Sequence, residues 1–185
     1  MPHDRILNNS TTALLVVDVQ EAFRNAIPDF ALIASRISVA VRGFQALETP
    51  ILVTEQYPRG LGHTAEEIQL VLGESAEKFE KSAFSSCGAS GFVDRLREKS
   101  IQQVVVCGIE THVCVNQSVH DLLNDGFQVH VLTDAVGSRF EHDKQAGLKK
   151  MIGSGAVPSS IEMALFELMD DSKHDQFRQI QGLIK

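Results

Sequence analysis

The stretch Val104-Val-Val-Cys-Gly-Ile-Glu-Thr-His-Val-Cys-Val115 predicts a buried strand that leads directly into a helix. Its first six residues are apolar or small without alternation, which is typical of a strand covered on both faces. An apolar helical face follows, formed by Val115, Val119, Leu122 and Leu123. Gly126 is expected to end this helix, because glycine is favoured just past the last helical turn. The segment therefore predicts one strand–helix unit of an α/β fold.

The same pattern recurs along the chain. Further buried strands are expected at residues 12–17, 50–54 and 127–132, with a short strand near residues 156–157. Helices are expected at residues 32–47, 92–96 (capped by Ser90), 143–152 and 177–184, and one more opening at Ser159 or Ser160. Such alternation gives right-handed crossovers and parallel strands. We expect a three-layer α/β/α sandwich around a mainly parallel, Rossmann-like sheet, built as a single domain by residues 1–185.

The bulk composition fits one globular domain. With 185 residues, of which 43% are apolar and 22% charged, the chain is long enough to bury one core. A formal net charge of −7 argues against general binding of nucleic acid or anionic membranes, because no basic excess neutralises phosphates. No apolar run reaches the roughly 18 residues of a membrane span. The first residues also lack the apolar core of a signal peptide.

The three cysteines cannot all pair within the chain and show no CxxC spacing, so we expect free thiols and a cytoplasmic location. Cys107 lies in the middle of a predicted strand and is interpreted as core, and Cys87 lies in a loop. Cys114 is expected at or near a helix start, where backbone N–H groups and the helix dipole favour a thiolate. The alternative for Cys114 is a small core residue, because free cysteine is among the most buried types.

Polar residues that follow the predicted strands are candidates for a site, because ligands of open α/β sheets bind beyond the carboxyl ends of the strands. These positions are held by Asp18, Glu55, Glu110 to Cys114 and Asp134. Asp18 taken alone also fits a turn or cap. An irregular region from Glu55 to about Ser90 has the length of a functional loop and contains Lys81. Taken alone, this lysine fits a solvated surface residue.

The joint pattern resembles a known family, the isochorismatase-like cysteine hydrolases. Leu14-Leu-Val-Val-Asp-Val-Gln-Glu-Ala-Phe23 is similar to their Asp-x-Gln-x-x-Phe opening strand, and Phe79-Glu-Lys-Ser-Ala-Phe-Ser85 to their Lys-x-x-Phe segment. Val106-Cys-Gly-Ile-Glu-Thr-His-Val-Cys-Val115 is similar to their Gly-x-x-x-x-x-Cys-Val signature. The order and spacing also match. Residues 54–62 and 177–185 most resemble the subgroup of isochorismatase domain-containing proteins.

The resemblance implies a catalytic triad of Asp18, Lys81 and Cys114. Cys114 would attack an amide-type carbonyl and form a thioester, with Asp18 carrying protons and Lys81 stabilising the charged forms. The resemblance places the oxyanion hole at the backbone N–H groups of Glu110 and Cys114. It also implies a cis peptide between Ile109 and Glu110. The expected activity is therefore hydrolysis of a small carboxamide or related C–N substrate, with no cofactor.

The sequence departs from the nicotinamidase branch of this family at the metal site. Nicotinamidases carry an Asp-x-His pair after the second strand, where this chain has Thr54-Glu55-Gln56. His63 and His112 remain conceivable ligands, but without a placed carboxylate they do not define a metal site. We therefore expect no metal, and the missing pair disfavours nicotinamidase activity.

The pocket walls are predicted from residues near these motifs. Phe23, Tyr57 and Phe84 are expected to line a partly aromatic pocket for a small planar substrate, with a core role as the alternative for each. Gln20, Thr111 and His112 are expected to add hydrogen bonds. Leu61, between two glycines, is a candidate lid residue.

Three other functions stay open at this point. The alternatives to amide hydrolysis are a non-catalytic binding or scaffold protein, an isochorismatase-type vinyl-ether hydrolase, and a redox-sensing thiol protein. The presence of Cys114 favours amide hydrolysis over the vinyl-ether reaction, and no resolving cysteine sits at a recognisable spacing. By resemblance we also expect a homo-oligomer, a dimer or tetramer, that acts on a small molecule without nucleic-acid or membrane partners.

Overall fold

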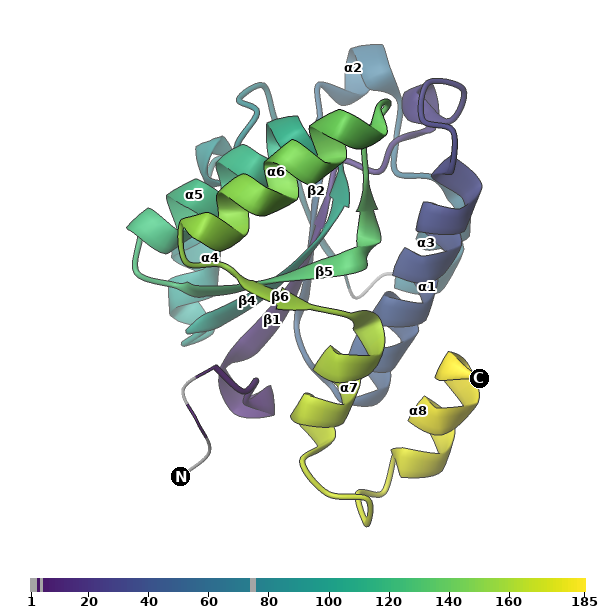
Figure 1. Ribbon diagram of the computed structural model, residues 1–185, viewed down its shortest axis with the longest axis vertical. Coiled ribbons are helices and arrows are strands. Elements are labelled where there is room, and N and C mark those ends of the chain that lie inside the picture. The colour runs from purple at the N-terminus through teal and green to yellow at the C-terminus, as the bar shows by residue number, and fades with distance from the viewer. Residues whose placement is uncertain (1–2, 4, 74–75) are drawn as a thin grey trace.

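A six-stranded parallel sheet forms the centre of the molecule (Figure 1). The computed structural model describes residue 3, residues 5–73 and residues 76–185. The strands lie in the order β3-β2-β1-β4-β5-β6. Their bounds are β1 Thr12–Val17, β2 Ile51–Gln56, β3 Glu77–Lys81, β4 Gln103–Ile109, β5 Gln128–Gly137 and β6 Val157–Ser159.

Helices cover both faces of this sheet, which confirms the predicted three-layer α/β/α architecture. One face packs against α1 (Phe30–Ala46), α3 (Glu66–Leu72), α7 (Ile161–Met169) and α8 (Phe177–Ile184). The other face packs against α4 (Phe92–Glu98), α5 (Asn116–Asn124) and α6 (Glu141–Gly153). Alternate residues of β1 enter the two cores: Leu14 and Val16 on the first face, Leu15 and Val17 on the second. Burial on both faces explains why this strand is an unbroken apolar run.

The topology places a ligand site between β1 and β4. The chain leaves β1 toward β2 on one side and returns through β4 on the other, so these strands form the switch point of the sheet. Crevices beyond the carboxyl ends of strands at such a point are the usual ligand sites of open α/β sheets. Asp18 directly follows β1, and Glu110 directly follows β4. The fold therefore brings these two candidate residues to the same edge.

The region from Glu55 to Ser90 was predicted to be irregular, and this prediction is wrong. It contains a short helix α2 (Pro58–Leu61), helix α3, strand β3 and a 3-10 turn at Ser86–Gly88. Strand β3 pairs with β2 in parallel, and Lys81 at its end lies beside Gln56 in the register. Lys81 is thus anchored by an edge strand. Four of the five residues of this strand are charged, so a search for apolar runs does not detect it.

Three further boundaries differ from the prediction. Gly91 in the left-handed region precedes α4, so Ser90 is not its cap. Strand β5 continues to Gly137, which places Asp134 inside the strand, where it pairs with Arg36. Glu55 likewise lies inside β2, and its Oε1 accepts hydrogen bonds from the backbone and hydroxyl of Thr64. In the described chain, we find no helix with the length and apolar character of a membrane span.

Candidate active site

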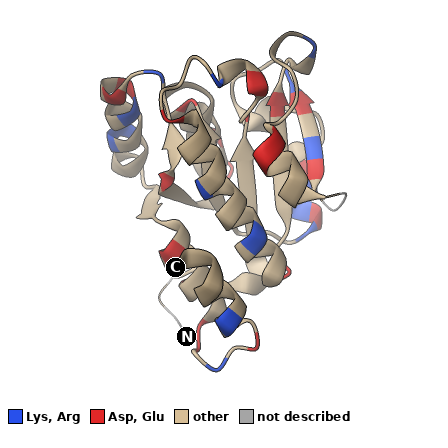
Figure 2. Cartoon of the chain, turned by 90° about the vertical axis from the view of Figure 1, so that its right-hand side faces the viewer, with Lys and Arg blue, Asp and Glu red and all other residues tan. Residues whose placement is uncertain are grey.

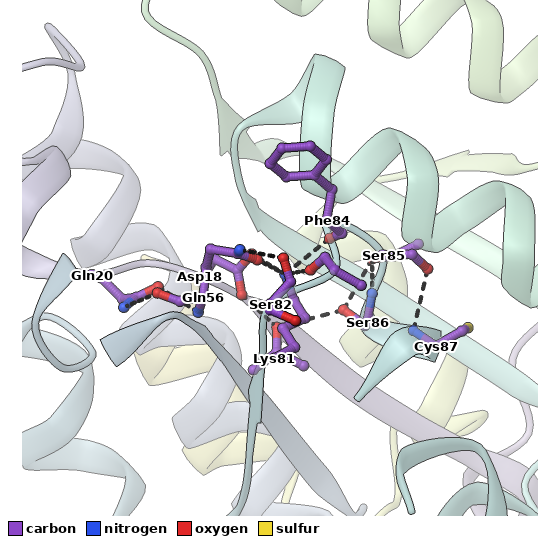
Figure 3. Close-up of polar contacts among 12 residues, drawn as sticks. Asp18, Gln20, Gln56, Lys81, Ser82, Phe84, Ser85, Ser86 and Cys87 are labelled. Carbon is purple, nitrogen blue, oxygen red and sulfur yellow. Dashed lines mark hydrogen bonds and ion pairs between the residues drawn. The ribbon is translucent and has the colours of Figure 1, made fainter. Parts of the chain in front are cut away.

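Lys81 is the centre of a buried hydrogen-bond network beyond the ends of β1, β2 and β3 (Figure 3). Its side chain is fully buried, and Nζ donates to Asp18 Oδ2 at 2.6 Å and to Gln56 Oε1 at 2.8 Å. Nζ also lies 3.1 Å from the carbonyl of Ala83 and 2.9 Å from that of Phe84. A buried ammonium is stable only with such partners, so the position of Lys81 is tightly fixed.

Asp18 is held in place by its backbone and by two side-chain partners. Its φ of 51° lies in the left-handed region, which a non-glycine residue adopts rarely and often at functional sites. The hydroxyl of Thr54 donates to Oδ1 at 2.8 Å, and Lys81 occupies Oδ2. The Asp18 N–H donates to the Thr54 carbonyl at 3.1 Å. The carboxylate is therefore buried, paired and oriented.

Cys114 lies in a π-helical turn, Thr111–Val115, that joins β4 to α5. Burial raises the pKa of its thiol to about 12, helped by the negative charge of Asp18 and a hydrogen bond to that carboxylate. The ammonium of Lys81 acts in the opposite direction and lowers this pKa. The expectation that the helix start favours a thiolate is thus corrected. Burial and the Asp18 carboxylate raise the pKa of the thiol by more than the helix start lowers it, so the resting group is a thiol.

The turn before Cys114 has the predicted unusual backbone. The peptide bond between Ile109 and Glu110 is cis, as the resemblance implied. The Glu110 carbonyl accepts hydrogen bonds from the N–H groups of Val113 at 3.0 Å and Val115 at 3.2 Å. These bonds close the turn and hold Cys114 beside Asp18. Cys107, by contrast, is fully buried in β4, as predicted for a core residue.

Cys114 opens onto a cavity of about 340 Å³, large enough for a small substrate. The predicted residues Phe23, Phe84 and Glu110 line it, together with the candidate lid residue Leu61 of α2. Three further residues line the cavity that were not predicted from the sequence: Gln56, Val113 and Arg139. Arg139 follows β5 by two residues, so a correct end for that strand would have revealed it.

Four predicted substrate-binding residues lie outside the lining of this cavity. Gln20 is buried, donates to the carbonyls of Gln56 and Gly62, and accepts from the Gln56 N–H, which makes it a brace between loops. Tyr57 is mostly exposed beside α2. Thr111 donates its hydroxyl to the Gly137 carbonyl, and His112 contacts Ser138 through Nδ1 at 3.1 Å. None of these four side chains is among the residues that line the cavity. Gln20, Thr111 and His112 instead bond to neighbouring loop and strand residues.

The described residues contain no group of three or more His, Cys, Asp or Glu side chains arranged to hold a metal ion. His63 instead contacts Glu55, with Nδ1 at 3.3 Å from Oε2, and Glu55 also accepts from Thr64. The position that differs from the nicotinamidase pattern is therefore occupied by a structural carboxylate. Its pKa is lowered, because the Thr64 and His63 hydrogen bonds together outweigh its burial.

Comparisons with known proteins agree with this geometry. A family model described as Isochorismatase domain matches residues 12–163. Isochorismatase family protein 1A of Dictyostelium discoideum is 36% identical over 181 residues, covering 96% of this chain and 87% of that protein. Isochorismatase domain-containing protein 2 of Pongo abelii is 38% identical and covers 98% of this chain and 86% of that protein.

A solved structure, of MAR1 ribonuclease from Caenorhabditis elegans, resembles this one with a TM-score of 0.92 at 38% identity. The match covers 97% of this chain and 92% of the nematode chain. The family match runs from β1 into α7 and so includes Asp18, Lys81 and Cys114. Sequence, fold and relatives agree, and the chain belongs to the isochorismatase family.

Proposed function

We propose that this protein is a hydrolase that cleaves a small carboxamide or a related C–N substrate through a thioester on Cys114. The observation that supports it is one carboxylate, Asp18, which contacts the ammonium of Lys81 and the thiol of Cys114 beside a cavity. A nucleophile, a base next to it and a group that orients the base are the parts that covalent catalysis needs.

The first half-reaction forms the thioester. A thiol with a pKa of about 12 is protonated near neutral pH, so Asp18 takes its proton as Sγ attacks the carbonyl carbon. The carbonyl oxygen becomes an oxyanion, which the backbone N–H groups of Glu110 and Cys114 stabilise. When the intermediate collapses, the C–N bond breaks, Asp18 returns its proton to the nitrogen, and ammonia or an amine leaves.

The second half-reaction releases the acid. Water enters the place of the amine, gives a proton to Asp18 and attacks the thioester carbonyl. The C–S bond then breaks, the carboxylic acid is released, and the thiolate of Cys114 recovers its proton from Asp18. Lys81 stays paired throughout and holds the carboxylate within reach of sulfur and water.

The alternatives are less well supported by the site. A scaffold protein has no need for a buried carboxylate, ammonium and thiol in contact, and vinyl-ether hydrolysis needs no thiol nucleophile. The nematode relative is called a ribonuclease. This chain carries a net charge of −7, and Figure 2 shows acidic and basic residues interspersed over the visible face. Both features disfavour an RNA-binding surface.

An acyl-enzyme assay tests the proposed function. Incubating the protein with a panel of small amides is expected to release ammonia, and rapid acid quenching should leave an acyl adduct that peptide mass spectrometry locates on Cys114. The variant Cys87→Ala, which removes a thiol from outside the cavity, should behave like the parent. The Cys114→Ala variant should form no adduct.

Equal ammonia release by the parent and Cys114→Ala would refute the thioester route. An RNA arm belongs in the same experiment. Cleavage of RNA by both proteins, without amide hydrolysis by either, would favour the activity for which the nematode relative is named.

A further inference from the structure

The polar groups of the active-site cavity are nearly all occupied by the protein itself. Gln56 accepts from Lys81 at Oε1 and donates from Nε2 to the Ser82 carbonyl at 2.8 Å. Glu110 Oε2 accepts from both the backbone N–H and the Nε of Arg139, each at 3.0 Å. Apart from the reacting thiol and these groups, the cavity walls are apolar side chains. The guanidinium of Arg139 is the cationic group that remains to face a ligand.

Glu110 fixes the direction of this guanidinium. The Glu110 side chain is 8% exposed, and the Arg139 side chain that pairs with it is 51% exposed. Arg139 donates to Glu110 through its Nε and its backbone nitrogen. Within the described residues, its terminal Nη groups donate to no protein acceptor. Arginine carries its Nη donors as a planar fork that matches the two oxygens of a carboxylate.

We propose that Arg139 selects substrates that carry a carboxylate in addition to the scissile C–N bond. This inference rests on the proposed function, because it assumes that Cys114 is the nucleophile. The Nη fork would hold the carboxylate, while Phe84, Leu61 and Val113 contact the carbon skeleton. A monoanion fits better than a phosphate dianion, because the carboxylate of Glu110 already lines this cavity and that of Asp18 contacts the Cys114 thiol. The substrate class is thus a small acid with an amide or ureido group.

Matched substrate pairs test this selection. Each pair contains a carboxylate amide and its neutral methyl ester, and kcat/KM is measured by ammonia release. We expect the parent to prefer the carboxylate member, and Arg139→Gln to reduce this preference about 10- to 100-fold, the value of a forked charge-assisted contact. Arg139→Lys keeps the charge without the fork and should retain part of the preference. The control is Arg59→Gln, which removes the same charge from exposed α2 without touching the cavity.

The outcomes separate the two proposals. An unchanged preference in Arg139→Gln, or the same loss in Arg59→Gln, would overturn the role of Arg139 while amide hydrolysis still stands. If no amide of either kind releases ammonia, the proposed function itself fails. Because Arg139→Gln removes the guanidinium that pairs with the buried Glu110 carboxylate, thermal denaturation checks that both Arg139 variants remain folded at the assay temperature.

A second inference comes from a line of buried hydroxyl groups that ends at Asp18. The Ser86 N–H donates to Ser118 Oγ at 2.7 Å, and the Ser118 hydroxyl donates to Ser86 Oγ at 2.9 Å. Ser86 Oγ lies 3.4 Å from Thr54 Oγ1, which in turn donates to Asp18 Oδ1 at 2.8 Å. The three hydroxyl-bearing side chains are buried, and Figure 3 shows Ser86 close to the Asp18–Lys81 pair.

The direction of this line follows from counting protons. A hydroxyl has one proton, and that of Thr54 is donated to Asp18. At the contact between Thr54 and Ser86, the donor must therefore be Ser86. The three hydroxyl-to-oxygen bonds, from Ser118 to Ser86, from Ser86 to Thr54 and from Thr54 to Asp18, then all point from α5 toward the carboxylate. Aligned hydrogen bonds polarise one another. The geometry points to Thr54, Ser86 and Ser118 as positioning residues that stabilise the ionised form of the catalytic base.

The pH profile of amide hydrolysis tests the role of this line of hydroxyl groups. Removing donors makes the Asp18 carboxylate easier to protonate, so the acidic limb of kcat/KM should move to higher pH. We expect a displacement of about one pH unit in Thr54→Val and about half a unit in Ser118→Ala, which breaks the line farther from Asp18. The control Ser38→Ala deletes a hydroxyl that bonds to main-chain carbonyls of α1 and α3 and should leave the limb in place.

A fall in kcat without displacement of the acidic limb would show a merely structural role and overturn the inference. If the acidic limb moves in Thr54→Val but not in Ser118→Ala, the effect is limited to the one hydrogen bond from Thr54 to Asp18, and the role of the longer line of hydroxyl groups is overturned. If Thr54→Val does not fold, the Ser118→Ala profile decides the question by itself.

Discussion

Replacing Asp18 with asparagine is expected to lower the rate of ammonia release by about 10³-fold or more, a value typical for loss of a base in a catalytic unit. The shape of the side chain is kept, and Lys81 retains Gln56 and the carbonyls of Ala83 and Phe84 as acceptors. The fold should therefore survive. What is lost is the carboxylate that is hydrogen-bonded to the Cys114 thiol and would accept its proton during attack.

The same substitution should make Cys114 react faster with iodoacetamide. Asp18 raises the pKa of this thiol and Lys81 lowers it, so removing the carboxylate lowers the pKa below its value of about 12. More thiolate then forms at a given pH, although each thiolate is a weaker nucleophile. The net effect is that the alkylation rate rises about threefold for each unit by which the pKa falls. The rate–pH curve should move to lower pH.

Cys87 provides the internal control for this measurement. Burial raises its pKa to about 12 as well, but the neighbouring charges that contribute are Asp121 and Asp125. Its alkylation should be the same in the parent and in Asp18→Asn, which mass spectrometry reads in one sample. Slower alkylation of Cys114 in the variant would contradict the assigned effect of Asp18 on the thiol.

The parts of this molecule that are buried on both sides were predictable from sequence. Strands β1 and β4 are unbroken apolar runs because both of their faces pack against helices, and the polar residues at their ends mark the site. Strand β3 was missed because it lies at the edge of the sheet, where Glu77, Lys78 and Glu80 keep contact with water. An apolar run is not needed there, so periodicity gives no signal.

The chemical state of the site was not predictable in the same way. The position of Cys114 near a helix start indicates a lowered pKa, yet the thiol is governed by burial and by Asp18, which is 96 residues away along the chain. Arg139 was missed for a related reason. The apolar pattern of β5 stops at Leu132, while the strand continues through the half-buried Thr133 and Asp134 to Gly137. Tertiary contacts, not local pattern, decide both features.

Replacing Gly108 with alanine is expected to cost at least about 4 kcal/mol of stability or to prevent folding. Gly108 has a φ of 124°, a conformation that side chains rarely permit. An alanine Cβ would lie 2.2 Å from the carbonyl oxygen and 2.7 Å from the nitrogen of Val17. These are backbone atoms of the paired strand β1, so relief requires β1 and β4 to separate at the edge that carries Asp18 and Glu110.

Chemical denaturation followed by circular dichroism measures this cost, with Gly153→Ala as the matched control. Gly153 ends α6, and no atom lies within 4 Å of the position an alanine Cβ would take. Alanine there should be neutral or stabilising by up to about 1 kcal/mol, because it favours the helix. A loss below about 1 kcal/mol in Gly108→Ala would mean that the two strands can part without penalty. The close approach of β1 and β4 would then not be what holds Asp18 beside the turn of Cys114.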